Sequence, residues 1–313
     1  MVNGRNFLIL LFLAAMFGAS FLYMRVAAPA VGPWVVAFVR VGLAALLLVA
    51  VTRRAGLQTI ARDWRSFLFL GAVNAALPFG MFAFAETTLT ASLGAILNAM
   101  APMGMALASA AWLGQPLTRR KLAGIGLGVL GVVTIVGLGH VDLDGPHLVA
   151  MAACLIAVSG YAVGFTYAKR NMPHVDPVTI SLGQALMAAI VLAPGAIATM
   201  PATMPGPEVL LALVALATFS TALAWPLMFR LVGAIGPTAS STVTFLAPAF
   251  GIAWGALLLG ESIGPSLLVG AVLVLASVAL VVGIRPPTAR FREFVDRLWT
   301  TAPRMASNAE TRG

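Results

Sequence analysis

The first half of the chain repeats in its second half after a shift of 146 positions. Leu-Gly-Gln-Pro-Leu at 113–117 aligns with Leu-Gly-Glu-Ser-Ile at 259–263, whereas the basic residues at 119–121 align with uncharged Pro-Ser-Leu at 265–267. Cytoplasmic loops of membrane proteins hold the excess of Lys and Arg, so matching motifs with opposite loop charge predict two copies that lie upside down relative to each other. Inverted repeats of this kind are found mainly in transporters.

The composition places these repeats in a membrane. The chain is 60% hydrophobic and only 9% charged, and a helix that crosses a bilayer needs about 20 apolar residues. Ten windows of roughly that length are separated by charged or Pro/Gly-rich breaks: 7–27, 34–51, 67–85, 90–113, 121–138, 147–168, 178–198, 209–231, 238–259 and 266–284. We therefore expect an all-α polytopic membrane protein with ten transmembrane helices in two inverted five-helix repeats.

The expected domains are residues 1–140, residues 141–286 and a tail at 287–313. In the tail, apolar residues between Phe291 and Trp299 follow helical spacing, with charged residues on the other face. This pattern predicts a short amphipathic helix on the inner leaflet, and a plain stop-transfer anchor is the alternative.

The basic residues predict the orientation. With the N-terminus in the cytoplasm, the cytoplasmic side holds 17 of the 19 Lys and Arg residues, and the two exceptions are Arg25 and Arg40. We therefore expect a multi-pass protein of the cell inner (plasma) membrane with both termini in the cytoplasm. The first window is expected to be retained rather than cleaved as a signal peptide, because its partner window in the second copy must be retained.

Other function classes lack the residues that they need. Cys154 is the single cysteine, and the three His residues show no ligand spacing. No Asp pair, His-rich helix or Ser/His arrangement suits hydrolysis inside a membrane. The net charge of +9 is spread along one predicted membrane face, which speaks against nucleic acid as a partner. We expect no enzyme activity, no catalytic residue, no metal site and no cofactor.

Polar side chains in the middle of apolar windows are candidates for a substrate cavity, because there they must face protein or a wet space. Asn74 and Asn98 align with polar residues of the second copy, and the aromatic Phe79 aligns with another aromatic residue. In the first helices the best shift is 144, which aligns Phe17 with Tyr161. Hydrogen bonding between helices, or ordinary core packing, is the alternative for each candidate. The expected cavity residues are Arg40, Asn74, Phe79, Asn98, Tyr161, Gln184, Ser220, Trp225 and Thr244.

Arg40 is the one strong charge inside a window. A cation there is costly unless it is paired or hydrated, so Arg40 either binds a substrate carboxylate or locks helices through backbone carbonyls and a partner such as Glu86, and we favour locking. Glu86 and Glu261 lie at the outer ends of their windows, where we expect water. Proton coupling therefore has no support from the sequence, and facilitated diffusion fits it equally well.

Prolines and glycines predict where helices bend and where they pack closely. Pro102 and Pro248 align with each other in mid-window, and a proline removes a backbone hydrogen bond, so we expect both to kink their helices and to serve the rocking of one bundle against the other. Glycines four apart, such as Gly124 and Gly128, let helix backbones approach closely. A homodimer through Gly124–Gly137 is the weaker hypothesis.

Three kinds of segment resemble the EamA family of the drug/metabolite transporter superfamily. Pro33–Val49, with Arg40, looks like that family's second helix; segments 97–115 and 245–261 look like its fourth and ninth; and 124–137 and 270–283 look like its glycine-spaced fifth and tenth. The resemblance covers nearly the whole chain. It implies two inverted five-helix bundles, a substrate cavity between them near the midplane, and export of small metabolites such as amino acids. Gln115 departs from the Glu usual in the family, whereas Glu261 keeps it.

The sequence thus predicts an exporter of small organic metabolites, most simply amino acids or related solutes, working by alternating access. Its expected partners are a small-molecule substrate and the lipid bilayer, with a second copy of the chain as a further candidate. A multidrug or lipophilic-cation exporter is the alternative within transport, although no acidic residue lies in mid-membrane. A membrane scaffold or sensor that acts through its tail is the alternative from another class.

Overall fold

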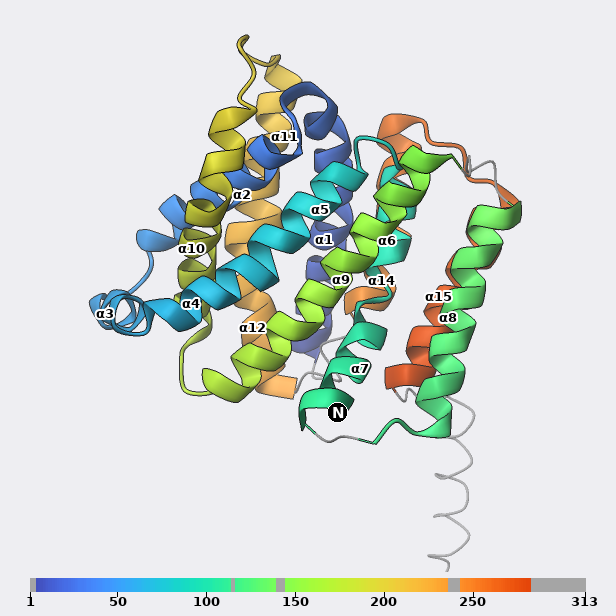
Figure 1. The fold of residues 1–313 in the computed structure, drawn as a ribbon, viewed down its shortest axis with the longest axis horizontal. Coiled ribbons are helices and arrows are strands. Elements are labelled where there is room, and N and C mark those ends of the chain that lie inside the picture. The colour runs from blue at the N-terminus through green and yellow to red at the C-terminus, as the bar shows by residue number, and fades with distance from the viewer. Residues whose placement is uncertain (1–3, 114–115, 139–143, 236–242, 283–313) are drawn as a thin grey trace, which may run out of the picture. The chain divides into compact units, whose positions relative to one another are not determined.

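The computed structural model describes residues 4–113, 116–138, 144–235 and 243–282, and within these ranges the chain is helical and contains no strand. In chain order the helices are α1 (Gly4–Val31), α2 (Pro33–Val49), α3 (Arg54–Arg62), α4 (Trp64–Gly71), η1 (Ala72–Ala76), α5 (Leu77–Ala85), α6 (Ala91–Asn98), α7 (Ala101–Leu113), α8 (Arg119–Leu138), α9 (Gly145–Asn171), α10 (Pro177–Ala198), α11 (Pro207–Ala217), η2 (Thr218–Leu223), α12 (Ala224–Ile235), α14 (Val243–Leu259) and α15 (Pro265–Val282) (Figure 1). The two η segments are π-helices. The amphipathic helix expected in the tail lies outside the described residues.

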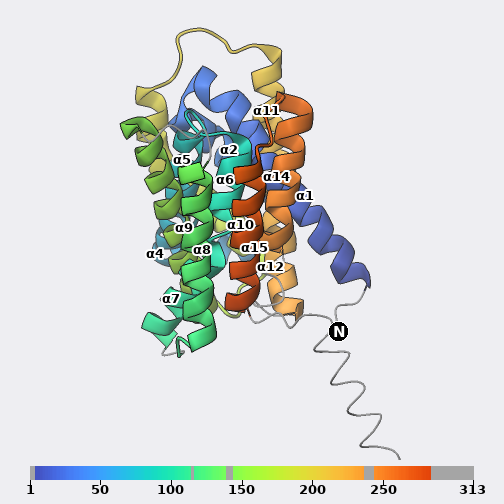
Figure 2. The ribbon, with the colours of Figure 1, turned by 90° about the vertical axis from the view of Figure 1, so that its right-hand side faces the viewer.

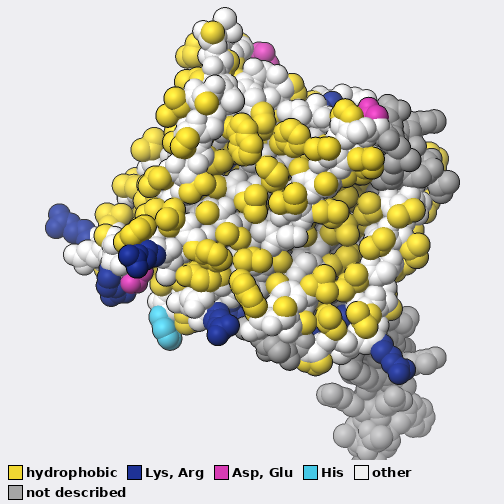
Figure 3. Space-filling view, viewed as in Figure 1, with side chains coloured by type: hydrophobic (Ala, Val, Ile, Leu, Met, Phe, Trp, Pro, Cys, Tyr) yellow, Lys and Arg dark blue, Asp and Glu magenta, His cyan; other side chains and the backbone are white. Residues whose placement is uncertain are grey.

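Many of these helices are suited to a bilayer. Six described stretches are long and apolar enough to cross a membrane: Leu8–Val31, Trp64–Ala85, Ala91–Trp112, Gly145–Asn171, Pro177–Ala198 and Pro207–Leu231. Shorter apolar helices are Pro33–Val49, Leu246–Leu259 and Pro265–Ser277. Apolar side chains cover the middle of the face in Figure 3, and most of its basic side chains lie along the lower edge. Apolar surface on this scale marks contact with lipid or with another protein.

Helix starts follow from local chemistry. Gly32 adopts φ 85°, which a side chain would disfavour, and this allows the chain to turn from α1 into α2. α2 then starts at Pro33. Proline has no backbone N–H, but the first N–H groups of a helix have no partner within the helix, so no hydrogen bond is lost there. The side chain of Asp144 accepts a hydrogen bond from His147 N, and Asp176 caps α10 in the same way.

Helix contacts repeat between the two halves. α1 packs along α14, and α9 packs along α6 and α7, which is the same pairing after the shift of the repeat. In the same way α5 packs on α9, and α11 and α12 pack on α1. α2 contacts α10, and α8 contacts α15 along most of its length, so each of these pairs joins a helix to its own copy (Figures 1 and 2).

The α8–α15 pair uses small residues for close packing. A Cβ added at Gly131 would lie 2.9 Å from Val274 Cγ2 and 3.0 Å from the Gly270 carbonyl oxygen. A Cβ at Gly128 would lie 2.8 Å from Ser277 Oγ. The side of α8 that carries Gly128 and Gly131 is therefore occupied by α15 of the same chain, whereas Gly126 has open space beside it. The homodimer through Gly124–Gly137 stays a prediction.

Two π-helical segments lie at equivalent places in the two halves. η1 spans Ala72–Ala76 and η2 spans Thr218–Leu223, so both begin at positions that are related by the 146-residue shift. A π-helical turn inserts one extra residue into a helix and leaves its neighbouring carbonyls free for other donors. Next to η2, the Leu216 carbonyl accepts a hydrogen bond from Thr221 Oγ1 at 2.9 Å.

The two aligned prolines have different surroundings. Pro102 lies in the first turn of α7, directly after a break at 99–100 that separates α6 from α7. Pro248 lies inside the continuous α14. The break at 99–100 aligns with 245–246, and in the described part of the second repeat α14 runs through these positions.

Candidate functional site

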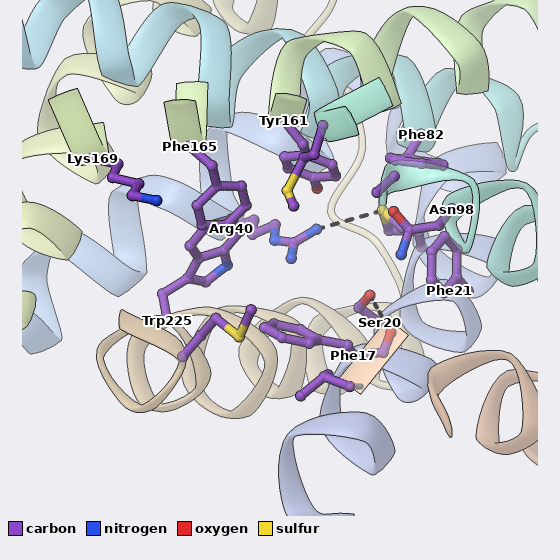
Figure 4. Close-up of a pocket in the computed structure, with 15 residues that line it drawn as sticks. Phe17, Ser20, Phe21, Arg40, Phe82, Asn98, Tyr161, Phe165, Lys169 and Trp225 are labelled. Atoms are coloured by element: carbon purple, nitrogen blue, oxygen red, sulfur yellow. Dashed lines mark hydrogen bonds between the residues drawn. The ribbon is translucent and has the colours of Figure 1, made fainter. Parts of the chain in front are cut away.

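A cavity of about 130 Å³ lies between the two halves of the chain. Helices α1, α2, α5, α6 and α7 of the first half line it together with α9, α12 and α14 of the second. One water molecule needs roughly 10–15 Å³ by this kind of measure, so the cavity is large enough for a small organic solute with its water. It extends to Lys169, an exposed residue near the end of α9 (Figure 4).

Arg40 enters this cavity from α2. The residue is only 3% exposed, and its Nε donates to Thr221 Oγ1 at 2.9 Å, so the π-helical segment η2 supplies its first partner. Its Nη1 lies 3.7 Å from Met24 Sδ, and its Cζ lies 3.7 Å above the centre of the Phe79 ring. The expected partner Glu86 makes no hydrogen bond with Arg40. The guanidinium is thus oriented by neutral groups and faces the cavity (Figure 4).

An aromatic wall stands beside Arg40. Trp225 of α12 stacks on Phe165 of α9, with ring centres 5.7 Å apart and an angle of 11° between the ring planes. Tyr161 lies 6.1 Å from the same indole. Trp225 is 5% exposed, and its buried Nε1 has no hydrogen-bond partner. An indole N–H in such a place usually finds an acceptor, so it is a donor available to a bound solute.

The expected cavity residues fall into two groups. Arg40, Asn98, Tyr161 and Trp225 line the cavity. The others that can be described lie behind its wall: Asn74 Nδ2 donates to Gln184 Oε1 at 2.9 Å, Ser220 Oγ donates to the Met16 carbonyl at 2.7 Å, and Phe79 packs against Arg40. Asn74, Gln184 and Ser220 thus make hydrogen bonds across helix contacts, as the alternative for each candidate has it, although Asn74 Oδ1 has no partner. The side chain of Thr244 lies outside the described residues.

Sequence reasoning missed part of the wall. Phe165 and Lys169 follow Tyr161 at helical spacing on α9, and Phe21 follows Phe17 on α1 in the same way. The shift of 144 that pairs Phe17 with Tyr161 also pairs Phe21 with Phe165, and this repeated aromatic stripe was the available signal.

The charge of the cavity is positive. Arg40 and Lys169 line it, and none of its described lining residues is acidic. No group of three or more His, Cys, Asp or Glu residues that could hold a metal ion occurs in the described part of the chain. The arrangement offers hydrogen-bond donors and positive charge beside flat apolar surfaces, and it offers no group placed for covalent chemistry.

Two carboxyl groups, those of Glu86 and Glu261, lie at the end of the bundle away from Lys169. Glu86, just after α5, is fully buried, although we expected water at this position. Phe21 of α1 and the backbone of α6 at Gly94 cover it. Glu261, in the connection between α14 and α15, accepts hydrogen bonds from the first residues of α6. The expectation of a hydrated Glu86 is therefore wrong, because neighbouring helices close over the end of α5.

Comparisons with known proteins agree with this architecture. The model of the EamA-like transporter family matches residues 6–137 and 148–283. The uncharacterized transporter YvbV of Bacillus subtilis is 27% identical over 88% of this chain and 91% of its own length. A probable amino-acid metabolite efflux pump of Salmonella typhimurium is 27% identical over 85% of this chain and 91% of its own length, and protein PecM of Dickeya dadantii is 26% identical over 81% and 84%.

The fold has also been observed in a solved structure. A crystal structure superposes with a TM-score of 0.67 over 93% of this chain and 99% of its own, at 16% identity. The two family matches together cover most of both halves, and the family and the relatives from Bacillus subtilis and Salmonella typhimurium are transporters and not enzymes. The chain therefore belongs to the EamA-like transporter family, as a multi-pass membrane transporter built from two repeats.

Proposed function

We propose that the chain exports small organic metabolites, amino acids or related solutes, by alternating access between two inverted five-helix bundles at residues 1–140 and 141–286. Ten membrane-crossing helices are part of this proposal. The cavity between the repeats is the substrate site, with Arg40, Trp225, Tyr161 and Asn98 as the contacting residues.

The chemistry of the cavity wall carries this proposal. The Arg40 guanidinium and the unpartnered Trp225 Nε1 are both donors, and Lys169 adds a second cation. Donors and cations of this kind bind a carboxylate, while the rings of Phe165 and Tyr161 offer apolar area for the rest of the solute. An amino acid has both parts, and the Salmonella typhimurium relative is named an amino-acid metabolite efflux pump.

The distribution of charge supports an orientation with both termini in the cytoplasm of a bacterial inner membrane. Exposed arginines at the start of α3, the start of α8 and the end of α9 lie where alternating helices would return to one side. Arg54, Arg119 and Arg170 are examples. Lys169 belongs to the same side, so the cavity reaches the cytoplasm and the Glu86 end faces outward.

A lipophilic-cation exporter is the alternative within transport. Such a carrier would need an acidic residue or an unusually electron-rich cage at the site. Two cations and no acid among the described lining residues favour an anionic or zwitterionic solute instead.

The test is flux into liposomes that contain the purified protein, with a mixture of labelled amino acids, in the presence and absence of a pH gradient. We expect equilibrating uptake that falls strongly in Trp225→Ala. Trp112→Ala is the matched control, because Trp112 is 46% exposed on α7 and should contact lipid. Absence of amino-acid flux in every protein, or equal loss in both variants, would overturn the proposal.

A scaffold or sensor that acts through the tail is the alternative from another class. Deletion of residues 288–313 separates the two, because a carrier should retain its flux without the tail.

A further inference from the structure

Glu86 is an unpartnered carboxyl group in a closed site. Its side chain is fully buried, and neither Oε1 nor Oε2 has a hydrogen-bond partner. A Cβ built at Gly94 of α6 would overlap Glu86 Oε1 and would lie 3.1 Å from Phe21 Cδ1. The carboxyl group therefore lies directly against the α6 backbone, in a space that exists because residue 94 is glycine.

Glu261 is close by but has a full set of donors. Its Oε1 accepts from Ala91 N at 2.8 Å, and its Oε2 accepts from Ser92 N at 3.1 Å and from Ser92 Oγ at 2.5 Å. These donors are the first N–H groups of α6, where the helix dipole also favours a negative charge. Through these hydrogen bonds Glu261 fixes the α14–α15 connection of the second repeat to a helix of the first.

The other ionisable groups near Glu86 do not neutralise it directly. Arg25 of α1 donates to the Glu86 backbone carbonyl at 2.8 Å, and not to its carboxyl oxygens. The charge of Arg25 attracts a negative charge on Glu86, but this effect is smaller than the cost of burial and the repulsion from Glu261. Cys154 of α9 also lies within electrostatic range and would add to the repulsion if ionised. A buried carboxylate without donors is strongly disfavoured, and a second carboxylate nearby adds to the penalty. In the closed arrangement Glu86 is therefore stable as the neutral acid.

We propose that Glu86 is a proton-binding site coupled to the outer gate: its carboxyl group holds a proton while α1, α5, α6 and the α14–α15 connection are closed around it, and releases that proton when they separate and admit water. The step makes and breaks one O–H bond, and the proton is exchanged with the outer solution. This inference rests on the alternating access proposed above, and it gives that carrier a dependence on external pH.

The sign of the dependence follows from the two states. The closed state binds the proton more tightly than the open one, so acid on the outer side favours closure and alkali favours opening. With one proton involved, the ratio of open to closed protein changes by up to about tenfold per pH unit between the two proton affinities.

Cysteine accessibility measures the gate without a substrate. Cys154→Ala removes the single cysteine, and Leu89→Cys or Thr87→Cys then places a thiol in the turn after Glu86. Leu89 is 1% exposed, whereas Thr87 is exposed in the same turn. The rate of labelling by a membrane-impermeant maleimide is measured at each site from pH 5 to pH 8. The ratio of the two rates cancels the general effect of pH on thiol reactivity.

We expect this ratio to rise by tenfold or more with pH in protein that contains Glu86, to stay low and constant in Glu86→Gln, and to regain its rise in Glu86→Asp. A ratio that is constant in the parent protein, or that rises equally in Glu86→Gln, overturns the proton site. Amino-acid flux is measured on the same preparations. Flux together with a constant ratio overturns the proton site alone, whereas a pH-dependent ratio without flux supports the proton site and overturns the proposed substrate class.

Discussion

The fourth helix of the first repeat and its counterpart in the second both carry a proline at the aligned position, but within the described residues the proline starts a helix in the first repeat and lies inside a helix in the second. α6 ends at Asn98 and α7 begins at Ala101, so Pro102 starts a new helix, whereas Pro248 lies within α14. The break brings Asn98 to the cavity, and both Asn98 and Ala101 line it. One repeat thus uses its proline to end a helix at the substrate site, and the other accommodates the same residue in a continuous helix.

The same division extends to the site residues. The aligned residues Phe79 and Trp225 pack against each other, with ring centres 5.8 Å apart, and Phe79 contacts Arg40. Of the two, only Trp225 brings an N–H group and only Trp225 lines the cavity. Arg40 aligns with Gln184, which is turned away from the cavity and bonded to Asn74. The two repeats therefore share a backbone plan, including the two π-helical segments, while the first supplies the buried cation and the second supplies the indole. Neither repeat alone would form the site.

The largest expected effect comes from making the first repeat resemble the second at the buried cation. Arg40→Gln removes the charge that faces the cavity and leaves Thr221 without its donor. Loss of one partner from a buried, charge-assisted contact costs about 2–5 kcal/mol, so we expect the apparent affinity for an anionic or zwitterionic solute to fall by roughly 100-fold. Concentration-dependent flux in liposomes measures this change.

Gln184→Ala is the matched control for Arg40→Gln. Gln184 occupies the aligned position but makes its hydrogen bond behind the wall, so its removal should lower thermal stability and leave the apparent affinity within about twofold, since no cavity contact is lost. Equal losses of affinity in both variants would show that Arg40 acts by locking helices and not by binding the solute.

The second comparison concerns the hydrogen bonds held by the π-helical segments. Asn74→Ala leaves the buried Gln184 amide without its partner, which costs about 1–3 kcal/mol of stability. Ser220→Ala removes one donor to the Met16 carbonyl, which lies within helix α1. We therefore expect a loss of stability of about 1 kcal/mol or less. Thermal unfolding in detergent should rank Asn74→Ala below Ser220→Ala, and the reverse order would contradict the assignment of the more important link to the first repeat.

The sequence predicts the helices, but it does not predict where they deviate from α-helical geometry or what individual side chains contact. Apolar windows predict the helices of a membrane protein and loop charges predict the two repeats, because both depend only on composition along the chain. The π-helical segments at Ala72 and Thr218 depend on a one-residue shift of hydrogen bonds that packing decides. Whether Asn74 faces a cavity or another amide depends in the same way on Gln184, which is 110 residues away in the chain. The burial of Glu86 was not predicted, because its position at the end of an apolar window does not show that Phe21 and α6 cover it.

A smaller effect is expected from making the second repeat resemble the first at its aromatic position. Trp225→Phe keeps a ring against Phe165 but removes the unpartnered Nε1–H. A single hydrogen bond contributes about 1 kcal/mol, so we expect the apparent affinity to fall by roughly fivefold. Trp254→Phe is the control, because its Nε1 donates to the Ala15 carbonyl at 3.4 Å and lies away from the described cavity lining. A normal affinity in Trp225→Phe would mean that the indole nitrogen does not contact the solute.

The smallest effects should come from the two prolines, and they should have opposite signs. Pro102 lies in the first turn of α7, where a proline costs the helix no hydrogen bond. Its ring also reduces the conformational entropy of the unfolded chain, so Pro102→Ala should destabilise the protein by about 0.4–1 kcal/mol. Pro248 lies inside α14, where it removes a helix bond, so Pro248→Ala should be neutral or stabilising. Thermal unfolding measures both signs, and transport rates measured beside it test the rocking role. If both variants shift stability in the same direction, the difference between a broken and a continuous helix does not hold in the protein; if both leave the rate unchanged, neither proline serves as a hinge.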